Sequence, residues 1–596
     1  MPKNTKYSHT DRGDGAQTHP LTTTSHPRDK QPAWEWKALL VANCFLTIIV
    51  GYDASNVANI QASVYKAFGH IDILPWVALA YSVCNIALIP LGRKLFKLCD
   101  FRVLYNVPML FLIAGSAMSG SATGIGYVIA GRAVMALGSS IILQGIMNFN
   151  IIFTYPRELG LVQGCTGACF AIGLVLGPII GGAFANNEHT TWRWGFYLVI
   201  PLSAISLILQ VLCCPSYRIP TNKTGWQSIK EFDHIGNILH TAVCMLFPIS
   251  CMFLGSIGTW GITSAIATWT VFTFAMVLYA IQQSYSIGTT PENRFLSPCS
   301  LLNNRTVLLT WICTMCAAAC YGVALYYVPI YFAFSHGLDP LATGIRLMPF
   351  IGVFVVTVIV CGVLLSAVRR YKPFFLVGSA LLLIGGGLFQ TLTIETSESA
   401  VMGFETIIAA GLGMIWQLAV PVCSAFLPGT EDRLDLTVLV NMAQLGGIAA
   451  SLSIAGMIYQ STGFESLKVS VSNSNIELSE DAIRELLAGV ASPILLNGDP
   501  EITRLVTSAI TDAIKNCLLI VLAFGGLSLL AASTMKWEAL QFKKPTREQI
   551  PKEIGHNRQR VQRSDNAIML DDLVIQRETP ASGSASQGAT QAQGQR

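Results

Sequence analysis

Charged residues are scarce in this chain. They make up 12% of its 596 residues, whereas a typical soluble domain carries about 25%. A water-soluble globular protein is therefore excluded. Hydrophobic residues account for 52% of the chain. This balance is typical of a polytopic membrane protein, and we expect an all-α fold.

Sequence motifs of hydrolases, nucleotide-binding proteins and metal proteins are also missing. The nine histidines form neither HExxH nor HxxxH, and no GxxxxGK[ST] loop occurs. The sixteen cysteines lie almost entirely within apolar runs, where they act as small apolar residues. The net charge of +4 is small and dispersed. We expect no enzyme, no cofactor, no metal and no nucleic-acid partner, so active transport would have to use an ion gradient.

Long apolar runs are what the chain has in abundance. A helix needs about 20 apolar residues to cross a bilayer. Fourteen runs meet this requirement, at about 38–58, 73–92, 103–122, 125–147, 160–184, 194–214, 236–256, 263–283, 307–332, 345–367, 373–393, 401–427, 438–459 and 516–535. An even number places both termini on one side. Lys and Arg gather in the loops of that side, so the positive-inside rule predicts cytoplasmic termini.

Polar segments flank and interrupt these runs. Residues 1–36 and 537–596 are predicted to be disordered tails, because they cannot bury enough apolar surface to fold. The segment 460–515 is predicted to be a long extracellular connection. It contains two helix signals, with Ser479 as an N-cap before EDAIRELL and a second start at Pro500.

Two ionisable residues lie inside apolar spans, where charge is costly and marks function by default. Asp53 lies in the first span and Arg132 in the fourth. Counted from the outer ends of their spans, both are about 8–10 Å deep at 1.5 Å per residue. They could meet if these spans are neighbours, and Asp53 could then take up and release a proton. A static ion pair, or an Asp53 that only caps its helix, remains an alternative.

The fifth span carries a face of glycines. Gly173, Gly177 and Gly181 are spaced four apart, with Gly182 beside them, so a neighbouring helix can approach backbone to backbone. Pro178 lacks an N–H and predicts a bend in the same turn. We expect a seam at which two halves of the protein move. A packing motif without motion is equally compatible with the pattern.

Other polar and aromatic residues in the spans carry weaker signals. Those that could face a central cavity, or equally make hydrogen bonds between helices, are Asn85, Gln144, Gln417 and Gln444. Tyr326 and Tyr327 could stack on an apolar ligand, although an interfacial aromatic belt is the first interpretation. Glu405 and Arg346 lie close to the outer ends of their spans and are expected to reach water.

These segments together resemble the major facilitator superfamily, and within it the fourteen-span drug:proton antiporters. GLVLGPIIGGAF is similar to the antiporter signature GxxxGPxxGG. GRAVMALG resembles the span-four motif built on Arg132, and Asp53 matches the acidic position of the span-one motif. The loop LGRKLFKLCDFRVLY departs from the family pattern, because Lys97 stands where Asp is expected. The resemblance implies that this loop forms an inner gate, with Arg93, Lys94, Asp100 and Arg102 as its charged residues.

The resemblance also implies an architecture and a function. Two six-helix bundles, 37–214 and 304–536, would flank a linker, 215–303, that holds two extra spans. Substrate would bind between the bundles, and access would alternate by rocking. We expect a monomeric, proton-coupled exporter of small amphipathic organic compounds in the plasma membrane. An importer of a nutrient or siderophore is the alternative, and a non-transporting membrane sensor is a weaker one.

Overall fold

The computed structural model describes residues 27–68, 76–186, 190–218, 232–255, 261–290, 293–338, 340–427, 429–473, 480–487 and 500–540. Within these ranges the chain is helical, with one isolated β-bridge between Arg370 and Ala539. Fourteen helical segments in the described ranges are long and apolar enough to span a membrane. The prediction of an all-α, fourteen-span protein is therefore confirmed.

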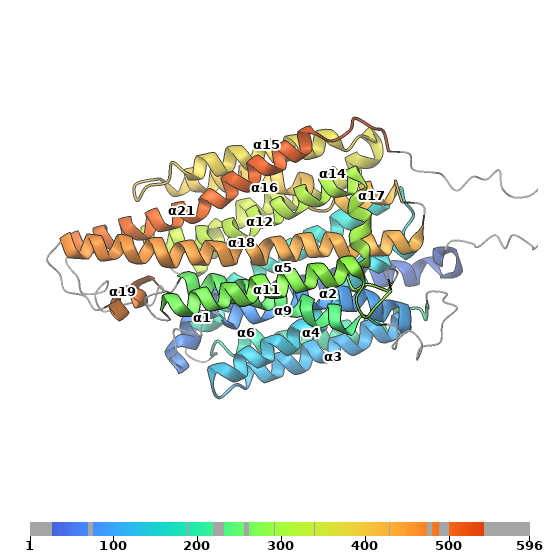
Figure 1. Cartoon of the computed structure of the whole chain (residues 1–596), viewed down its shortest axis with the longest axis horizontal. Coiled ribbons are helices and arrows are strands. Elements are labelled where there is room, and N and C mark those ends of the chain that lie inside the picture. Colours follow the sequence, from blue (N-terminus) through green and yellow to red (C-terminus); the bar gives the residue numbers. More distant parts are fainter. Residues whose placement is uncertain are drawn as a thin grey trace, which may run out of the picture. The chain divides into compact units, whose positions relative to one another are not determined.

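The first six spans pack against one another and are called the N-bundle (Figure 1). Their helices are α1 (Ala33–Phe68), α2 (Trp76–Leu98), α3 (Phe101–Gly120), α4 (Ile125–Phe153), α5 (Leu159–Asn186), and α6 with α7 (Trp194–Tyr197 and Val199–Cys213). Within this bundle α1 packs along α5, α3 along α4, and α2 against α4.

The last six spans form the C-bundle in the same way. Their helices are α12 (Arg305–Ser335), α13 with α14 (Pro340–Arg346 and Met348–Val368), α15 (Lys372–Phe389), α16 with α17 (Glu398–Ile415 and Ala419–Ser424), α18 (Thr430–Asn473) and α21 (Pro500–Ser533). The two bundles meet where α14 lies along α5 and where α18 lies along α2 and α4.

Two further spans, α9 (His234–Gly255) and α11 (Ile262–Tyr285), lie outside both bundles. α9 packs against α2 and α18, one helix from each bundle, and α11 packs against α9. Apolar side chains on α11 are largely exposed, as expected for a helix that faces lipid. The hairpin therefore covers one side of the junction between the bundles.

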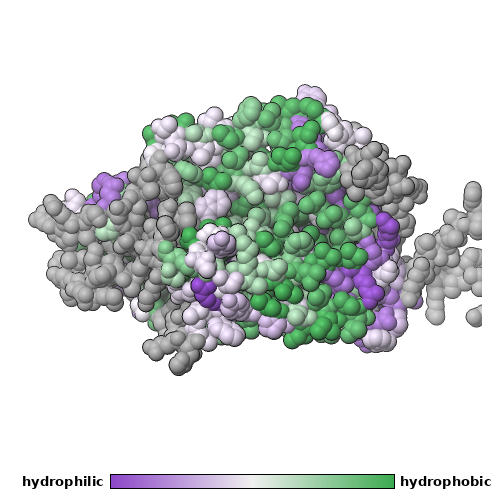
Figure 2. Space-filling view, turned by 90° about the horizontal axis from the view of Figure 1, so that it is seen from below, coloured by the Kyte–Doolittle hydropathy of each residue, from purple (hydrophilic) through white to green (hydrophobic). Residues whose placement is uncertain are grey.

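The end of the bundles at which α1 begins and α21 ends is called the tail end, and the opposite end the far end. The tail end lies at the right of Figure 1. Figure 2 shows hydrophobic residues over the middle of one face and hydrophilic residues at its tail-end margin. This distribution matches a protein whose middle contacts lipid.

Helix ends differ from the sequence prediction in two places. The short helix η1 (Pro27–Lys30) and the start of α1 are ordered, although residues up to 36 were expected to be disordered. Arg28 explains this order, because it pairs with Glu158 at 2.5 Å and lies over the ring of Trp36 at 3.8 Å. The rest of the predicted tails, residues 1–26 and 541–596, lies outside the described residues.

The second difference is at the far end. α18 continues to Asn473, so the first part of the predicted loop 460–515 is helical. The reason is packing beyond the apolar span: Leu467 is fully buried, and Tyr459 donates a hydrogen bond to the backbone oxygen of Leu487 in α19 (Glu480–Leu487). The helix start at Pro500 is confirmed. Ser479 lies outside the described residues.

Candidate functional site

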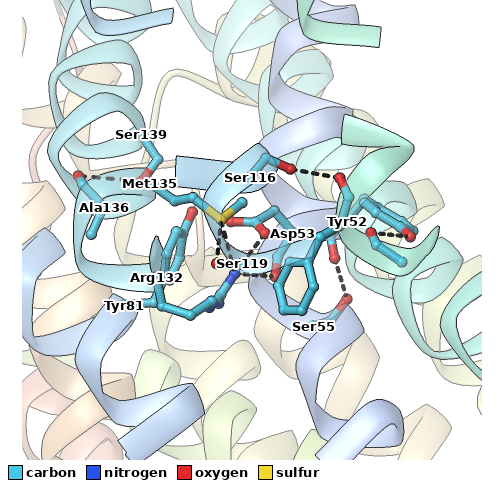
Figure 3. Close-up of polar contacts among 12 residues, drawn as sticks. Tyr52, Asp53, Ser55, Tyr81, Ser116, Ser119, Arg132, Met135, Ala136 and Ser139 are labelled. Atoms are coloured by element: carbon cyan, nitrogen blue, oxygen red, sulfur yellow. Dashed lines mark hydrogen bonds and ion pairs between the residues drawn. The ribbon is translucent and has the colours of Figure 1, made fainter. Parts of the chain in front are cut away.

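Asp53 and Arg132 are in direct contact inside the N-bundle (Figure 3). An Nη of Arg132 donates to Oδ1 of Asp53 at 2.6 Å. Both side chains are buried, with 0% and 1% of their surface exposed. α1 supplies the acid and α4 the base, so the first and fourth spans are neighbours, which is the condition under which the two side chains could meet.

The surroundings of the pair hold Arg132 more tightly than Asp53. Arg132 also donates from Nε to the backbone oxygen of Val77 at 3.3 Å, and its guanidinium lies 4.2 Å from the ring centre of Tyr81. In contrast, Oδ2 of Asp53 accepts no hydrogen bond from any described residue. The same is true of the Tyr81 hydroxyl within the described ranges. The carboxylate therefore depends on one partner, while the guanidinium has several.

This arrangement is suited to proton exchange. An isolated charge buried at this depth is costly, and the pair is tolerable because the two charges are close and opposite. If Asp53 takes a proton, its attraction for Arg132 is lost. Oδ2 then offers a free position for that proton without breaking another hydrogen bond of the carboxyl group.

The glycine face of α5 contacts α1, and the prediction that it forms a seam between two halves is wrong. A Cβ on Gly177 would lie 2.7 Å from the backbone nitrogen of Asn56, and one on Gly173 would lie 2.8 Å from that of Tyr52. Gly181 faces the Asn56 side chain. Gly182 is buried, and the helix continues through Pro178. All these contacts lie within the N-bundle.

The contact of α5 with the other bundle uses different small residues, which the sequence analysis missed. A Cβ on Gly160 would lie 2.7 Å from the backbone oxygen of Gly362 in α14, and one on Gly362 would lie 2.5 Å from that of Gly160. Ser366 donates to the backbone oxygen of Arg157 at 2.9 Å. At the far end, Gly344 of α13 approaches Ile179. These contacts of α5 with α13 and α14 form the seam between the two bundles.

A polar network joins the bundles on the opposite side. Gln144 of α4 donates to Thr437 of α18 at 2.6 Å and accepts from Asn441 at 2.8 Å. Asn148 accepts from Thr437 at 2.9 Å. Gln144 therefore makes hydrogen bonds between helices at the bundle junction, which is one of the two interpretations that the sequence left open.

An ion cluster closes the tail end of the same junction. Arg93 of α2 pairs with Glu431 at 2.5 Å and with Asp435 at 2.8 Å, both on α18. Lys97 lies 3.1 Å from Glu431. Glu431 and Asp435 were not singled out from sequence, although three acids in the first turns of an apolar helix, TEDRLD, are a visible signal.

Of the four residues assigned to an inner gate, Arg93 pairs with acids of the other bundle. Lys94 donates to the backbone oxygen of Arg294 at 3.1 Å. Asp100 caps α3 and accepts from Ser216 at 2.6 Å, and Arg102 donates to the backbone oxygen of Val211. The last two hold the α2–α3 connection in place within the N-bundle.

The twelfth span is broken where it faces α5. α16 ends at Ile415 and α17 begins at Ala419. Gln444 of α18 donates to the backbone oxygen of Trp416 at 2.8 Å, a carbonyl inside the break. Gln417 packs against Gly167 of α5, and its buried Oε1 has no partner among the described residues. Trp416 and Leu418 keep right-handed helical dihedrals, so the break is a local irregularity in the span.

The remaining predicted residues lie inside the bundles. Asn85 donates to the backbone of Tyr81 at 3.0 Å and accepts from Ser139 at 3.1 Å, so it links α2 to α4. Tyr327 is 3% exposed and packs on Tyr459, which excludes it from an interfacial aromatic belt. Tyr326 is half-buried beside it, with ring centres 5.1 Å apart.

The expectation that Glu405 reaches water is wrong. Its side chain is 1% exposed, although it lies only two turns into α16. The error arose because distance from a helix end does not reveal which way a side chain points. Arg346 is partly exposed and pairs with Glu398 at 2.6 Å.

Two six-helix bundles that meet through polar and small residues, with a buried ion pair in one of them, are the architecture of a membrane transporter. Residues 44–451 match the family model of the Major Facilitator Superfamily. The chain belongs to this superfamily, and it is a multi-pass membrane transporter for small molecules and not an enzyme.

Two fungal transporters are among the proteins similar to this chain. The MFS-type transporter pgmG of Aspergillus terreus is 28% identical, and the match covers 85% of this chain and 89% of the relative. The efflux pump patC of Aspergillus clavatus is also 28% identical, with 84% and 91% covered.

Solved structures agree with the fold. A bacterial homolog of the human lysosomal transporter Spinster, in its inward-facing and unoccupied conformation, matches with a TM-score of 0.53 at 13% identity over 85% of this chain and 98% of that one. A double-Trp mutant of XylE matches with a TM-score of 0.52 at 12% identity, over 86% and 97%. At these identities the likeness shows the fold alone.

Proposed function

We propose that this chain is a proton-coupled antiporter that exports small amphipathic organic compounds, with Asp53 as its proton carrier. The observation that carries this proposal is the buried Asp53–Arg132 pair, in which one carboxylate oxygen is unpartnered among the described residues. Ionisable residues buried in membrane spans are costly and are retained for function.

Coupling would follow from the pair's electrostatics. When Asp53 is ionised, the ion pair holds α1 to α4. A proton that arrives from the far end neutralises the acid and frees Arg132, which stays bound to Val77 and to the ring of Tyr81. The loss of this attraction would shift the N-bundle toward the conformation that releases the proton at the other side.

Cargo would bind between the bundles, near the break after α16. Gln417 supplies a hydrogen-bond acceptor there, and Gln144 lies across the junction on α4. The Arg93 cluster would close the tail end during part of the cycle, and the α5–α14 seam would act as the axis about which the bundles rock.

The direction of transport rests on the relatives. Several of them are named efflux pumps, including patC and the alnA protein of Emericella nidulans. We infer export from the cytoplasm, a plasma-membrane location, cytoplasmic termini and a monomeric state.

Cells that express the chain, and cells that lack it, can be loaded with the fluorescent amphiphiles rhodamine 6G, ethidium and Nile red. The proposal predicts lower accumulation of at least one dye in expressing cells, and loss of the difference when a protonophore is added. Higher accumulation in expressing cells would favour the importer. A difference that persists with the protonophore would contradict proton coupling.

A further inference from the structure

Two buried polar atoms beside Arg132 have no hydrogen-bond partner among the described residues. One is Oδ2 of Asp53, and the other is the hydroxyl oxygen of Tyr81. The Asp53 residue is 0% exposed and the Tyr81 residue 5%. Buried polar groups are normally hydrogen-bonded, so each exception requires an explanation. The ion pair supplies none, because Arg132 binds the other carboxylate oxygen, Oδ1.

The two side chains contact the same guanidinium group (Figure 3). Asp53 reaches Arg132 from α1 at 2.6 Å, and the ring centre of Tyr81 on α2 lies 4.2 Å from Cζ of Arg132. The polar group of Tyr81 also acts on the Asp53 carboxyl group. One side chain of α2 therefore faces both members of the ion pair, the base through its ring and the acid through its hydroxyl.

The other titratable groups near Asp53 are accounted for by the helices around it. α1 packs against α2, α4, α5, α6 and α7. Tyr52, the neighbour of Asp53 on α1, donates from its hydroxyl to the backbone oxygen of Gly195 at 2.9 Å. The remaining titratable residues on these helices, apart from side chains outside the described set, are Glu35, Lys37, Cys44, Cys84, Arg93, Lys94, Lys97, Tyr127, Cys165, Cys169, Tyr197 and Cys213.

Protonation changes what the Asp53 carboxyl group can do. An ionised carboxylate only accepts hydrogen bonds, whereas the protonated acid has an O–H group that donates one. A tyrosine hydroxyl can accept it. A proton on Oδ2 would therefore give a partner to both atoms that lack one. The face of the Tyr81 ring attracts the guanidinium group whether or not Asp53 is charged.

We propose that Tyr81 is a positioning residue for the transported proton: its hydroxyl accepts a hydrogen bond from protonated Asp53 while its ring holds the released Arg132. The inference rests on the proposed function and adds the residue that stabilises its proton-loaded state. Because this hydrogen bond exists only after protonation, it strengthens proton binding by Asp53. α2 also packs against α18 of the C-bundle, so the loaded state acts on a helix of the bundle junction.

The test follows the infrared absorption of the protonated Asp53 carboxyl group as the pH is lowered, in the purified full-length chain in lipid nanodiscs. The band is identified by its loss in Asp53→Asn. Tyr81→Phe should lower the pH midpoint of the band by about half to one pH unit, because one hydrogen bond to the protonated form is lost. Phenylalanine keeps the ring beside Arg132, so the variant removes the hydroxyl alone.

Tyr105→Phe is the matched control. Tyr105 lies on α3 of the same bundle, is 0% exposed, and has a hydroxyl without a hydrogen-bond partner among the described residues. Its variant should keep the wild-type midpoint. The melting temperature of Tyr81→Phe at alkaline pH should not fall, because the hydroxyl has no partner among the described residues while Asp53 is ionised.

Three results would overturn the inference and leave Asp53 as the proton carrier. They are an unchanged midpoint in Tyr81→Phe, a raised midpoint, which would mean that the hydroxyl donates to the ionised carboxylate, and an equal fall in Tyr105→Phe. If no band depends on Asp53 at any pH that the folded protein tolerates, the proposed function fails together with the inference.

Discussion

Asp53 and Arg132 stabilise the N-bundle only as a pair. Each is buried and each compensates the charge of the other at 2.6 Å. Removing one partner of such a pair leaves an uncompensated charge, which costs about 3–5 kcal/mol, whereas removing both costs much less. Substitution of Arg132 should lower the stability more than substitution of Asp53. The reason is that the carboxylate has no other partner among the described residues.

A double-mutant cycle measures this dependence. Arg132→Gln should lower the thermal stability of the purified protein strongly, and adding Asp53→Asn to it should restore part of the loss, because the orphaned charge is gone. Thermal unfolding in detergent, followed by tryptophan fluorescence, reports both effects. If the two losses simply add, the side chains do not compensate each other and the pair is not an energetic unit.

Among the helices, α5 shows how one element serves two different contacts. Its face with Gly173 and Gly177 lies against α1 within one bundle, and its face with Gly160 lies against α14 of the other. The first contact should be rigid and structural. The second lies where the bundles must move relative to each other.

Gly177→Ala tests the first contact. The added methyl group would meet the backbone nitrogen of Asn56 at 2.7 Å, so α1 and α5 must separate, and overpacking of this kind costs about 1–3 kcal/mol. Gly352→Ala in α14 is the matched control, because a Cβ there would meet no atom of a neighbouring described residue within 4 Å. A clear fall in melting temperature for Gly177→Ala alone is expected. Equal melting temperatures would show that the close α1–α5 approach is not required.

The helices themselves were predictable and their partners were not. Fourteen apolar runs predicted fourteen spans, because the length of an apolar run is set by bilayer thickness. The spacing of Gly173 and Gly177 predicted a face for close approach, but nothing in the spacing says which helix fills it. The prediction that Glu405 reaches water was wrong for a related reason, since the orientation of this side chain depends on α12, α14 and α15. Asp53 and Arg132 were found because buried charge has few structural uses.

For the molecule as a whole, the bundles meet through the α5–α14 seam, the polar network of Gln144 and the Arg93 cluster. The α5–α14 seam brings backbone against backbone at Gly160 and Gly362. The Arg93 cluster joins α2 to α18 through charges, with Arg93 1% exposed. We expect the cluster to act as a latch that must open once in each cycle.

Exchanging the charges of Arg93 and Asp435 tests whether the cluster acts as a latch. Arg93→Asp places like charges beside Glu431 and Asp435 and should reduce dye export at least about tenfold, because attraction across the junction becomes repulsion. Arg93→Asp combined with Asp435→Arg should recover part of the export rate. Lys97→Gln, at an exposed position, should change the rate by less than about twofold. Failure of the swapped pair to recover any export would argue that Arg93 has a role other than pairing with α18.

The central claim is that transport is driven through the proton on Asp53. Its most direct test is dye movement in liposomes that contain the purified protein and carry an imposed pH difference, with the wild type compared to Asp53→Asn. Asparagine keeps the size of the side chain and cannot exchange a proton. The account predicts that the wild type concentrates rhodamine 6G against its gradient in proportion to the pH difference, and that Asp53→Asn only lets it equilibrate. Concentration of the dye by Asp53→Asn to the wild-type extent would contradict the account.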